Sequence, residues 1–207
     1  MKSKKEGPDR TFIEGVRRAQ IVQCAADVIA ESGYARATMA EIAKRAGIAK
    51  SVISYHFVDK NELMQEIIRI AFETYTGLLE SRMAAESTVS GMIRAYLAAS
   101  ADYMTEHRSL NLAILEIAFN ALGPDGQPLR ATMPLEVHSS VLDQAIRDAQ
   151  VAGEMREFDI PVMTGLLRSA VTHTMVMAIR ADPGADLAAY ARELGTTFDL
   201  ATRPRGS

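Results

Sequence analysis

Several residue types and motifs are scarce in this chain of 207 residues, and each scarcity excludes a class of protein. Tryptophan is absent, and Cys24 is the only cysteine, so the chain cannot form an internal disulfide. Its four histidines are scattered without the spacing of metal ligands. No nucleophile motif and no glycine-rich phosphate loop is present. We therefore expect no metal, no cofactor and no enzymatic activity.

Signals for strands and for membrane segments are also missing. No alternating run of β-branched and aromatic residues lies between turn residues, so the sequence predicts an all-α fold. Hydrophobic residues make up 48% of the chain, which is enough to form a buried core. The first residues are basic, but no apolar segment follows them, and no stretch of about 18 residues is apolar enough to cross a bilayer. We expect a cytoplasmic protein.

Charge is divided unevenly along the chain, although its net charge is only −3. Residues 1–60 contain eleven Lys or Arg and seven Asp or Glu, a net charge of +4. Residues 61–207 contain twelve basic and nineteen acidic residues, a net charge of −7, and all six lysines lie in the first sixty residues. A basic segment joined to an acidic body is typical of a protein whose N-terminal part faces nucleic-acid phosphates.

Residues 33–63 contain the pattern of two short helices joined by a tight turn. Thr38 is expected to cap the first helix, and Glu41, three residues later, completes a capping box. Gly47 follows, where a residue in the left-handed conformation is needed to end that helix.

The second short helix is expected to begin near Ala49 or Lys50 and to end near Tyr55. Its apolar residues Val52 and Ile53 would point inward and leave its polar residues free. Two short helices in this arrangement are typical of a helix-turn-helix, whose second helix lies in the major groove of DNA.

Over roughly residues 11–70 the sequence resembles the DNA-binding domain of the tetracycline-repressor (TetR) family of bacterial transcription regulators. The resemblance is carried by Glu31-Ser32-Gly33-Tyr34, the helix from Thr38 to Arg45, the turn Ala46-Gly47-Ile48, Lys50 through Phe57, and Asp59-Lys60-Asn61-Glu62-Leu63. One departure is Ser54, where many members carry a tyrosine. The resemblance implies an N-terminal three-helix DNA-binding domain and a C-terminal helical domain that binds a ligand and dimerises, with about nine helices in all.

Two domains follow from this interpretation. Residues 1–58 would form an N-terminal arm and the helix-turn-helix domain, and residues 59–207 the ligand-binding and dimerisation domain. A long helix capped by Asp59 would connect them without a flexible linker. Further helices are expected at about residues 88–107, 109–122, 133–151, 159–180 and 185–201.

Eight residues are predicted to contact DNA. They are Arg36, Thr38, Lys50, Ser51, Ser54, Tyr55, His56 and Lys60. Lys50, Ser51 and Ser54 lie where base edges are read, since lysine can donate to guanine and serine can donate or accept at any base. The resemblance implies that Tyr55, His56 and Lys60 hold phosphates. For His56, the alternative is a histidine packed in the core. Backbone N–H groups near Thr38 can bind a further phosphate.

Apolar faces on the last two expected helices predict a homodimer. Arg168 is the only charged residue between Asp159 and Arg180. The residues expected at the interface are Leu166, Leu167, Ala170, Val171, Thr174, Leu187, Tyr190, Leu194 and Phe198. Two such helices from each chain can form a four-helix bundle, and packing within one chain is the alternative. A dimer would read an imperfect inverted repeat.

The resemblance also implies a ligand pocket in the C-terminal domain. Tyr96, Ser100, Tyr103 and His107 recur at spacings of four, three and four, and so share one helix face. The complete predicted set is Phe72, Tyr75, Tyr96, Ser100, Tyr103, Met104, His107, Glu116, Phe119, Asn120, His138, His173 and Met177. Aromatic and methionine residues at such spacing can equally belong to the core.

Glu116 has a special place in this set, because it is the only charged residue between Arg108 and Asp125. A buried carboxylate is costly unless it is paired or used. Glu116 would therefore either face the ligand or form a structural ion pair with Arg94 or Arg168.

The sequence thus favours a ligand-responsive transcriptional regulator, with duplex DNA, a second copy of the chain and a small effector as partners, and no membrane. The preferred hypothesis is a repressor that a small, largely apolar molecule releases from its operator. Three alternatives remain: a regulator whose ligand strengthens DNA binding, an architectural DNA binder without a ligand, and a helical enzyme that uses Glu116 with His107 or His173. No catalytic motif supports the last.

Overall fold

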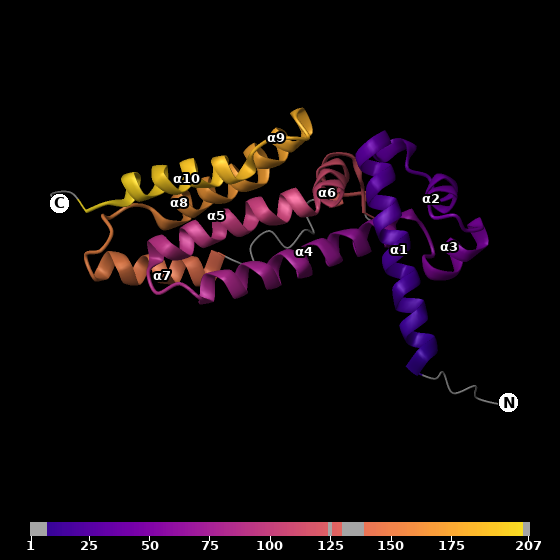
Figure 1. Cartoon of the computed structure of the whole chain (residues 1–207), viewed down its shortest axis with the longest axis horizontal. Helices are drawn as coiled ribbons and strands as arrows, with labels where there is room; N and C mark the ends of the chain where they lie inside the picture. The colour runs from indigo at the N-terminus through magenta and orange to yellow at the C-terminus, as the bar shows by residue number, and fades with distance from the viewer. Residues whose placement is uncertain (1–7, 124–125, 130–138, 205–207) are drawn as a thin grey trace. The chain divides into compact units, whose positions relative to one another are not determined.

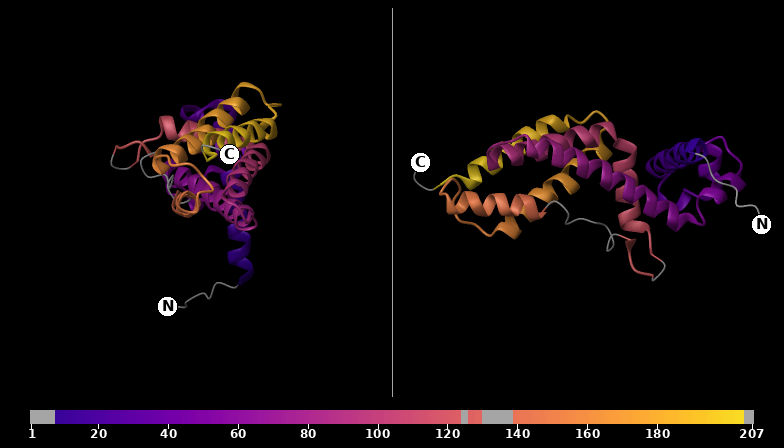
Figure 2. Two further views of the ribbon diagram at one scale, coloured as in Figure 1. Left: turned by 90° about the vertical axis from the view of Figure 1, so that its left-hand side faces the viewer. Right: turned by 90° about the horizontal axis from the view of Figure 1, so that it is seen from below.

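The computed structural model describes residues 8–123, 126–129 and 139–204, and these form the helices drawn in Figures 1 and 2. Among them there is no strand, only an isolated bridge between Leu122 and Pro128. The predicted all-α class is therefore confirmed. The chain divides into a first unit, Met1–Ile70 with Leu112–Met133, and a second unit, Ala71–Asn111 with Pro134–Ser207.

The first unit contains the N-terminal helices and parts of two others. Its elements are α1 (Pro8–Ser32), the 3-10 turn η1 (Tyr34–Arg36), α2 (Met39–Arg45), α3 (Lys50–His56), the start of α4 (Lys60–Ala84) and the end of α6 (Arg108–Asn120). One apolar core holds them together. Its fully buried large side chains are Ile21, Ile29, Ile42, Ile53, Phe57, Leu63, Met64, Ile67, Ile117 and Leu129.

The Thr38 cap and the left-handed Gly47 at the ends of α2 are confirmed, but the predicted capping box is only half formed, because the Thr38 N–H donates to the Arg36 carbonyl oxygen at 2.9 Å and not to Glu41. Thr38 Oγ1 accepts the backbone N–H of Glu41 at 3.2 Å, which satisfies one of the donors left open at the helix start. Gly47 has a φ of +65°, a left-handed conformation that side chains disfavour. Asp59 caps α4 in the same way as Thr38 caps α2, since its Oδ1 accepts the N–H of Glu62 at 2.9 Å.

One prediction about α3 is wrong. Ile53 is fully buried, but its neighbour Val52, which was expected to point inward too, is 37% exposed. Successive residues of a helix are turned by about 100° from one another, and α3 packs only one face on the core. Ile53 and Phe57, four residues apart, occupy that face.

The second unit is formed by antiparallel helices, with α10 lying along α5 in both figures. Its elements are the end of α4, α5 (Val89–Glu106), the start of α6, α7 (Ser139–Val151), α8 (Ile160–Ser169), η3 (Ala170–Met175), α9 (Val176–Ala181) and α10 (Leu187–Thr202). Arg94 on α5 forms an ion pair with Asp199 on α10 at 2.5 Å. Asp159 caps α8 as expected, because its Oδ1 accepts the N–H of Val162 at 2.9 Å.

The helix expected at residues 159–180 exists as α8, η3 and α9 in series, and η3 is π-helical. A π segment marks an inserted residue, which periodicity alone does not reveal. The run Ile160–Ala181 has 22 residues and a mean hydropathy of 1.3, so by length and composition it could cross a membrane, contrary to expectation. A core helix satisfies the same criterion, and this is the one such helix in the described chain.

We predict that Ile53→Ala lowers the free energy of unfolding by about 2–5 kcal/mol, because it leaves a cavity at a fully buried position. Its matched control, Val52→Ala, should change that free energy by less than about 0.5 kcal/mol, since Val52 is partly exposed. Urea unfolding followed by circular dichroism measures both. Equal losses would contradict the assignment of the inward face of α3.

Candidate functional site

The outward face of α3 gathers four of the predicted DNA-contacting residues. Lys50, Ser51, Ser54 and Tyr55 are all exposed, and Tyr55 is 67% exposed although it is aromatic. The Tyr55 hydroxyl donates to Glu14 Oε1 on α1 at 3.2 Å. These residues therefore present one ammonium group and three hydroxyls to the outside, which are groups that bind base edges and phosphates.

His56 is half-buried at the end of α3, and its ring lies edge-on to that of Tyr55, with centroids 5.1 Å apart. Its carbonyl oxygen accepts a hydrogen bond from Arg18 of α1. The Arg18 guanidinium also lies 4.2 Å from the ring centroid of Phe57 and 3.4 Å from Glu66. Arg18 thus fixes the end of α3. Sequence reasoning missed this role, because its contacts lie about forty residues away in the chain.

Lys60 makes a different contact from the one expected. Its Nζ donates to the Tyr34 carbonyl oxygen at 2.6 Å and lies 3.8 Å from the centroid of the Tyr34 ring. Burial lowers the pKa of Lys60. The ammonium group therefore anchors η1 to the start of α4. The backbone N–H groups of that helix start are a separate source of phosphate contacts.

The other two predicted DNA contacts, Arg36 and Thr38, are exposed on either side of Ala37. Arg36 Nε donates to the Ser32 carbonyl oxygen at 2.7 Å, which holds its guanidinium against the end of α1. The Thr38 hydroxyl caps α2. Arg36 keeps other donors available, since a guanidinium has five N–H groups.

Glu116 contacts the same turn that Lys60 holds. Its Oε2 accepts the backbone N–H of Tyr34 at 3.4 Å and is also 3.4 Å from Asn120 Nδ2. Together with Lys60, Glu116 thus binds Tyr34 from a second helix. Phe119, the remaining predicted ligand residue on α6, is 66% exposed. These three ligand predictions lie in the first unit.

A group of contacting side chains in the second unit contains half of the other ligand predictions. We call Tyr75, Tyr96, Ser100, Tyr103 and His107 the tyrosine cluster. The hydroxyls of Tyr75 and Ser100 are 2.7 Å apart, and Ser100 donates to the Tyr96 carbonyl oxygen at 2.6 Å. The Tyr103 ring lies 5.1 Å from that of Tyr75 and 4.6 Å from that of His107, centroid to centroid.

The hydroxyl groups of the cluster are neutral, and that of Tyr103 donates to the Ala71 carbonyl oxygen at 2.9 Å. Burial raises the pKa of Tyr75, Tyr96 and Tyr103 above the ordinary value of a tyrosine, most strongly for Tyr96. Tyr75 and His107 remain partly exposed, whereas Ser100 is fully buried. Uncharged donors and acceptors beside apolar helix faces are what small-molecule sites contain.

The remaining ligand predictions are dispersed. Met104 is buried and Phe72 half-buried, while His173 on η3 and Met177 on α9 are exposed. His138 lies outside the described residues. The group that the structure brings together is thus the tyrosine cluster, from α4, α5 and the residue after α5.

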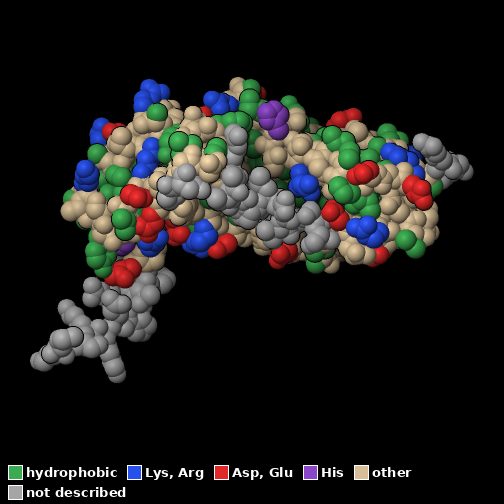
Figure 3. Space-filling view, turned by 180° about the vertical axis from the view of Figure 1, so that it is seen from behind, with side chains coloured by type: hydrophobic (Ala, Val, Ile, Leu, Met, Phe, Trp, Pro, Cys, Tyr) green, Lys and Arg blue, Asp and Glu red, His purple; other side chains and the backbone are tan. Residues whose placement is uncertain are grey.

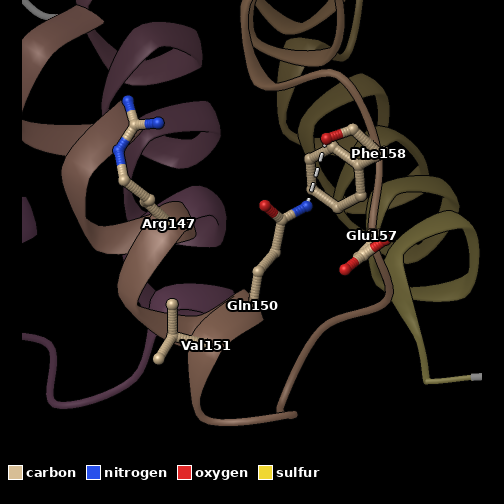
Figure 4. A pocket seen from close by; sticks show the side chains of 5 residues that line it. All are labelled: Arg147, Gln150, Val151, Glu157 and Phe158. Atoms are coloured by element: carbon tan, nitrogen blue, oxygen red, sulfur yellow. Dashed lines mark hydrogen bonds between the residues drawn. The ribbon is translucent and has the colours of Figure 1, made fainter.

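A separate surface hollow lies at the end of α7 (Figure 4). Arg147, Gln150 and Val151 of α7 face Glu157 and Phe158, and Gln150 Nε2 donates to the Phe158 carbonyl oxygen at 3.2 Å. None of the predicted ligand residues that the structure describes lines this hollow. On the face shown in Figure 3, acidic and basic side chains are interspersed over the second unit, so its acidic excess forms no single patch there.

The predicted dimer residues fall into two groups. Leu167, Val171, Leu187 and Phe198 are buried within a single chain, so they pack in the core of the second unit. The others retain exposed surface in the single chain. They are Leu166, Ala170, Thr174, Tyr190 and Leu194.

Comparison with known proteins agrees with the architecture of the first unit. Residues 21–67 match the family model of bacterial regulatory proteins of the tetR family. This match identifies the N-terminal part of the chain as a DNA-binding domain of the tetR type. It is also 32% identical over 88 residues to the HTH-type transcriptional regulator BetI of Paraburkholderia phytofirmans, a match that covers 42% of this chain and 45% of that protein. The chain thus spans less than half the length of the curated relatives it matches.

Solved structures of TetR-like regulators share the fold over most of the chain. The fatty acid degradation regulator FadR of Bacillus halodurans has a TM-score of 0.71 and 22% identity, with 93% of this chain and 95% of that chain covered. FadR of Bacillus subtilis, in complex with stearoyl-CoA, has a TM-score of 0.72 and 21% identity, with 86% and 95% covered. At this identity the likeness concerns the fold.

We predict that Lys60→Gln lowers the free energy of unfolding by about 1–2 kcal/mol, because the charged hydrogen bond and the ring contact with Tyr34 are both lost. Lys44→Gln is the matched control. Lys44 is exposed and pairs with Glu41 on its own helix, so its loss should cost less than about 0.5 kcal/mol. Urea unfolding measures both variants.

DNA binding gives a second measurement on the same variant. A lysine that neutralises a phosphate contributes about 0.9 to the slope of log K against log salt. Lys60→Gln should leave that slope unchanged if its ammonium group serves only Tyr34. A slope reduced by about one, with unchanged stability, would instead support the phosphate contact that the sequence predicts.

Proposed function

We propose that this protein is a DNA-binding transcriptional regulator, and that it is a repressor released from its operator by a small, largely apolar effector. The observation that carries the proposal is the outward face of α3, where Lys50, Ser51, Ser54 and Tyr55 are exposed together while Ile53 holds the helix on the core. The match of residues 21–67 to the tetR family model supports the same role. Lys50, Ser51 and Ser54 would read bases, and Tyr55, His56 and Arg36 would position the phosphate backbone.

The regulator would act as a homodimer, because one helix-turn-helix domain covers too few base pairs for tight binding. Apolar side chains left exposed on α8 and α10 support this pairing. Val162 and Leu166 on α8 are 60% and 58% exposed, and Tyr190 on α10 is 40% exposed. A second copy would cover these side chains, since helices of this kind pack into four-helix bundles.

The effector would bind at the tyrosine cluster of the second unit. Neutral hydroxyls on α4 and α5, the helices that also carry the half-buried Phe72 and the buried Met104, suit a molecule that is apolar over most of its surface. FadR of Bacillus subtilis, which has a similar fold, was solved in complex with stearoyl-CoA, and this supports a small-molecule site in a chain of this fold.

The signal would reach the DNA-binding domain through α4 and α6, because each of these helices contributes residues to both units. Both are tied to Tyr34, through Lys60 of α4 and Glu116 of α6. A tenfold loss of operator affinity needs about 1.4 kcal/mol of coupling free energy, so the effector must bind the DNA-incompetent conformation at least that much better.

Two alternatives make different predictions. In a regulator of the opposite sign, the effector would strengthen operator binding, and in an architectural protein no effector would exist. The bonded cluster of hydroxyls in the second unit favours an effector site over a purely architectural role. The regulator would work in the cytoplasm without catalysing a reaction.

We predict that selection from random duplex DNA enriches an imperfect inverted repeat. Lys50→Ala should relax preference at particular base pairs, by about 1–3 kcal/mol each, because a side chain that reads a base edge is lost. Tyr55→Ala should weaken binding to all sequences to a similar extent, as loss of a phosphate contact does. Sequencing of the selected pools and gel shifts measure the two effects.

Three results would contradict the proposal. Enrichment of a single half-site would argue against paired chains. An unchanged base preference in Lys50→Ala would remove Lys50 from the readout. No enrichment with the unaltered protein would refute specific DNA binding altogether.

A further inference from the structure

Val52 places an apolar side chain on the exposed side of α3. It is 37% exposed, although valine is among the residues most often buried. Ile53 and Phe57 occupy the inward face, and each residue of a helix is turned by about 100° from the one before it. Val52 therefore lies at the edge of the outward face, next to the exposed residues Ser51 and Tyr55.

The apolar surface continues from Val52 toward the start of α3. Ala49, three residues earlier, is exposed, and its carbonyl oxygen accepts the Val52 N–H at 2.9 Å. Residues three apart share one helix face, so the two side chains form a short apolar strip. On its other side the strip is bordered by Tyr55, whose hydroxyl is bonded to Glu14 and whose ring lies edge-on to His56. The described residues thus leave the strip open on the outward face of α3.

Helix stability does not account for a valine at this position. Valine favours a helix less than alanine does, because its branched side chain loses rotamer freedom. The exposed part of Val52 also gains nothing from the core that Ile53 and Phe57 fill. Against a base edge in the major groove, by contrast, the same exposed methyl groups would be buried.

Thymine is the base whose major-groove edge carries an apolar group. Its C5-methyl distinguishes it from cytosine, and apolar side chains contact that methyl. The polar residues of the outward face have other preferences, since lysine donates to guanine and serine donates or accepts at any base. An apolar side chain among them is therefore the group suited to select thymine.

We propose that Val52 is a specificity-determining residue, which reads the C5-methyl of a thymine in each half of the operator. This inference rests on the proposed binding of α3 in the major groove, and it specifies one base of the DNA that the protein selects. The contact buries the thymine methyl against the exposed methyls of Val52 and involves no charge. Unlike a phosphate contact, it leaves the dependence of binding on salt unchanged.

The test replaces thymine with deoxyuracil, which lacks only the C5-methyl. An operator recovered by selection from random duplex DNA is synthesised with each thymine replaced in turn, and its binding to the full chain is measured by fluorescence anisotropy. We expect one thymine in each half-site whose replacement weakens binding about fourfold, which is the effect of burying one hydrocarbon group.

Variants then assign that methyl to Val52. Val52→Ala should bind the thymine and deoxyuracil operators equally, with an unchanged slope of log K against log salt, since no phosphate contact is lost. Val16→Ala is the matched control, because Val16 is a valine of the same unit that is 55% exposed on α1. It should keep the full preference for thymine. Circular dichroism shows whether each variant is folded.

Each outcome decides the inference. An operator in which no thymine responds to replacement would overturn it and leave the proposed function intact. A response that persists in Val52→Ala, or one that disappears equally in Val16→Ala, would also overturn it, as would a Val52→Ala chain that does not fold. Selection that enriches no sequence would refute the proposed function and this inference with it.

Discussion

The burial of Ile53 and Phe57 decides which side of α3 is available to DNA. Both side chains are fully buried, and they occupy one helix face because they are four residues apart. Phe57 is covered by the Arg18 guanidinium, which also binds the His56 carbonyl oxygen. With that face fixed, the exposed ammonium and hydroxyl groups of α3 have no freedom to rotate toward the core.

Tyr34 connects this reading helix to the rest of the first unit. Its backbone N–H donates to the Glu116 carboxylate of α6. The Lys60 ammonium group of α4 donates to its carbonyl oxygen and lies over its ring. The turn η1 therefore contacts two helices, α4 and α6, that continue into the second unit. A displacement of either helix would therefore change the contacts at Tyr34.

Local features of the fold could be predicted from the sequence, and distant pairings could not. The caps at Thr38, Asp59 and Asp159 are bonds between residues three apart, and a short sequence pattern is enough to find them. The contact of Glu116 with Tyr34 joins residues 82 positions apart. The sequence shows only that Glu116 is an isolated charge. That pattern suggested Arg94 or Arg168 as its partner, and it gave no sign of a bond to a backbone N–H group.

In the candidate sites, too, features set by local sequence could be predicted and features set by distant packing could not. The exposed face of α3 was predictable, apart from Val52, because helix period and residue type define it. Helix period could not separate Leu166, which is exposed, from Leu167 and Val171, which are buried in their own chain. It also could not reveal the π segment η3, since an inserted residue shifts the helix face without changing composition.

Salt-dependent binding of the purified chain to duplex DNA, followed by fluorescence anisotropy, tests the central claim most directly. If the exposed side of α3 faces phosphates and bases, log K should fall linearly with log salt, at about 0.9 for each phosphate neutralised. A protein that binds duplex DNA with no salt dependence, or does not bind it even at low ionic strength, would contradict the account.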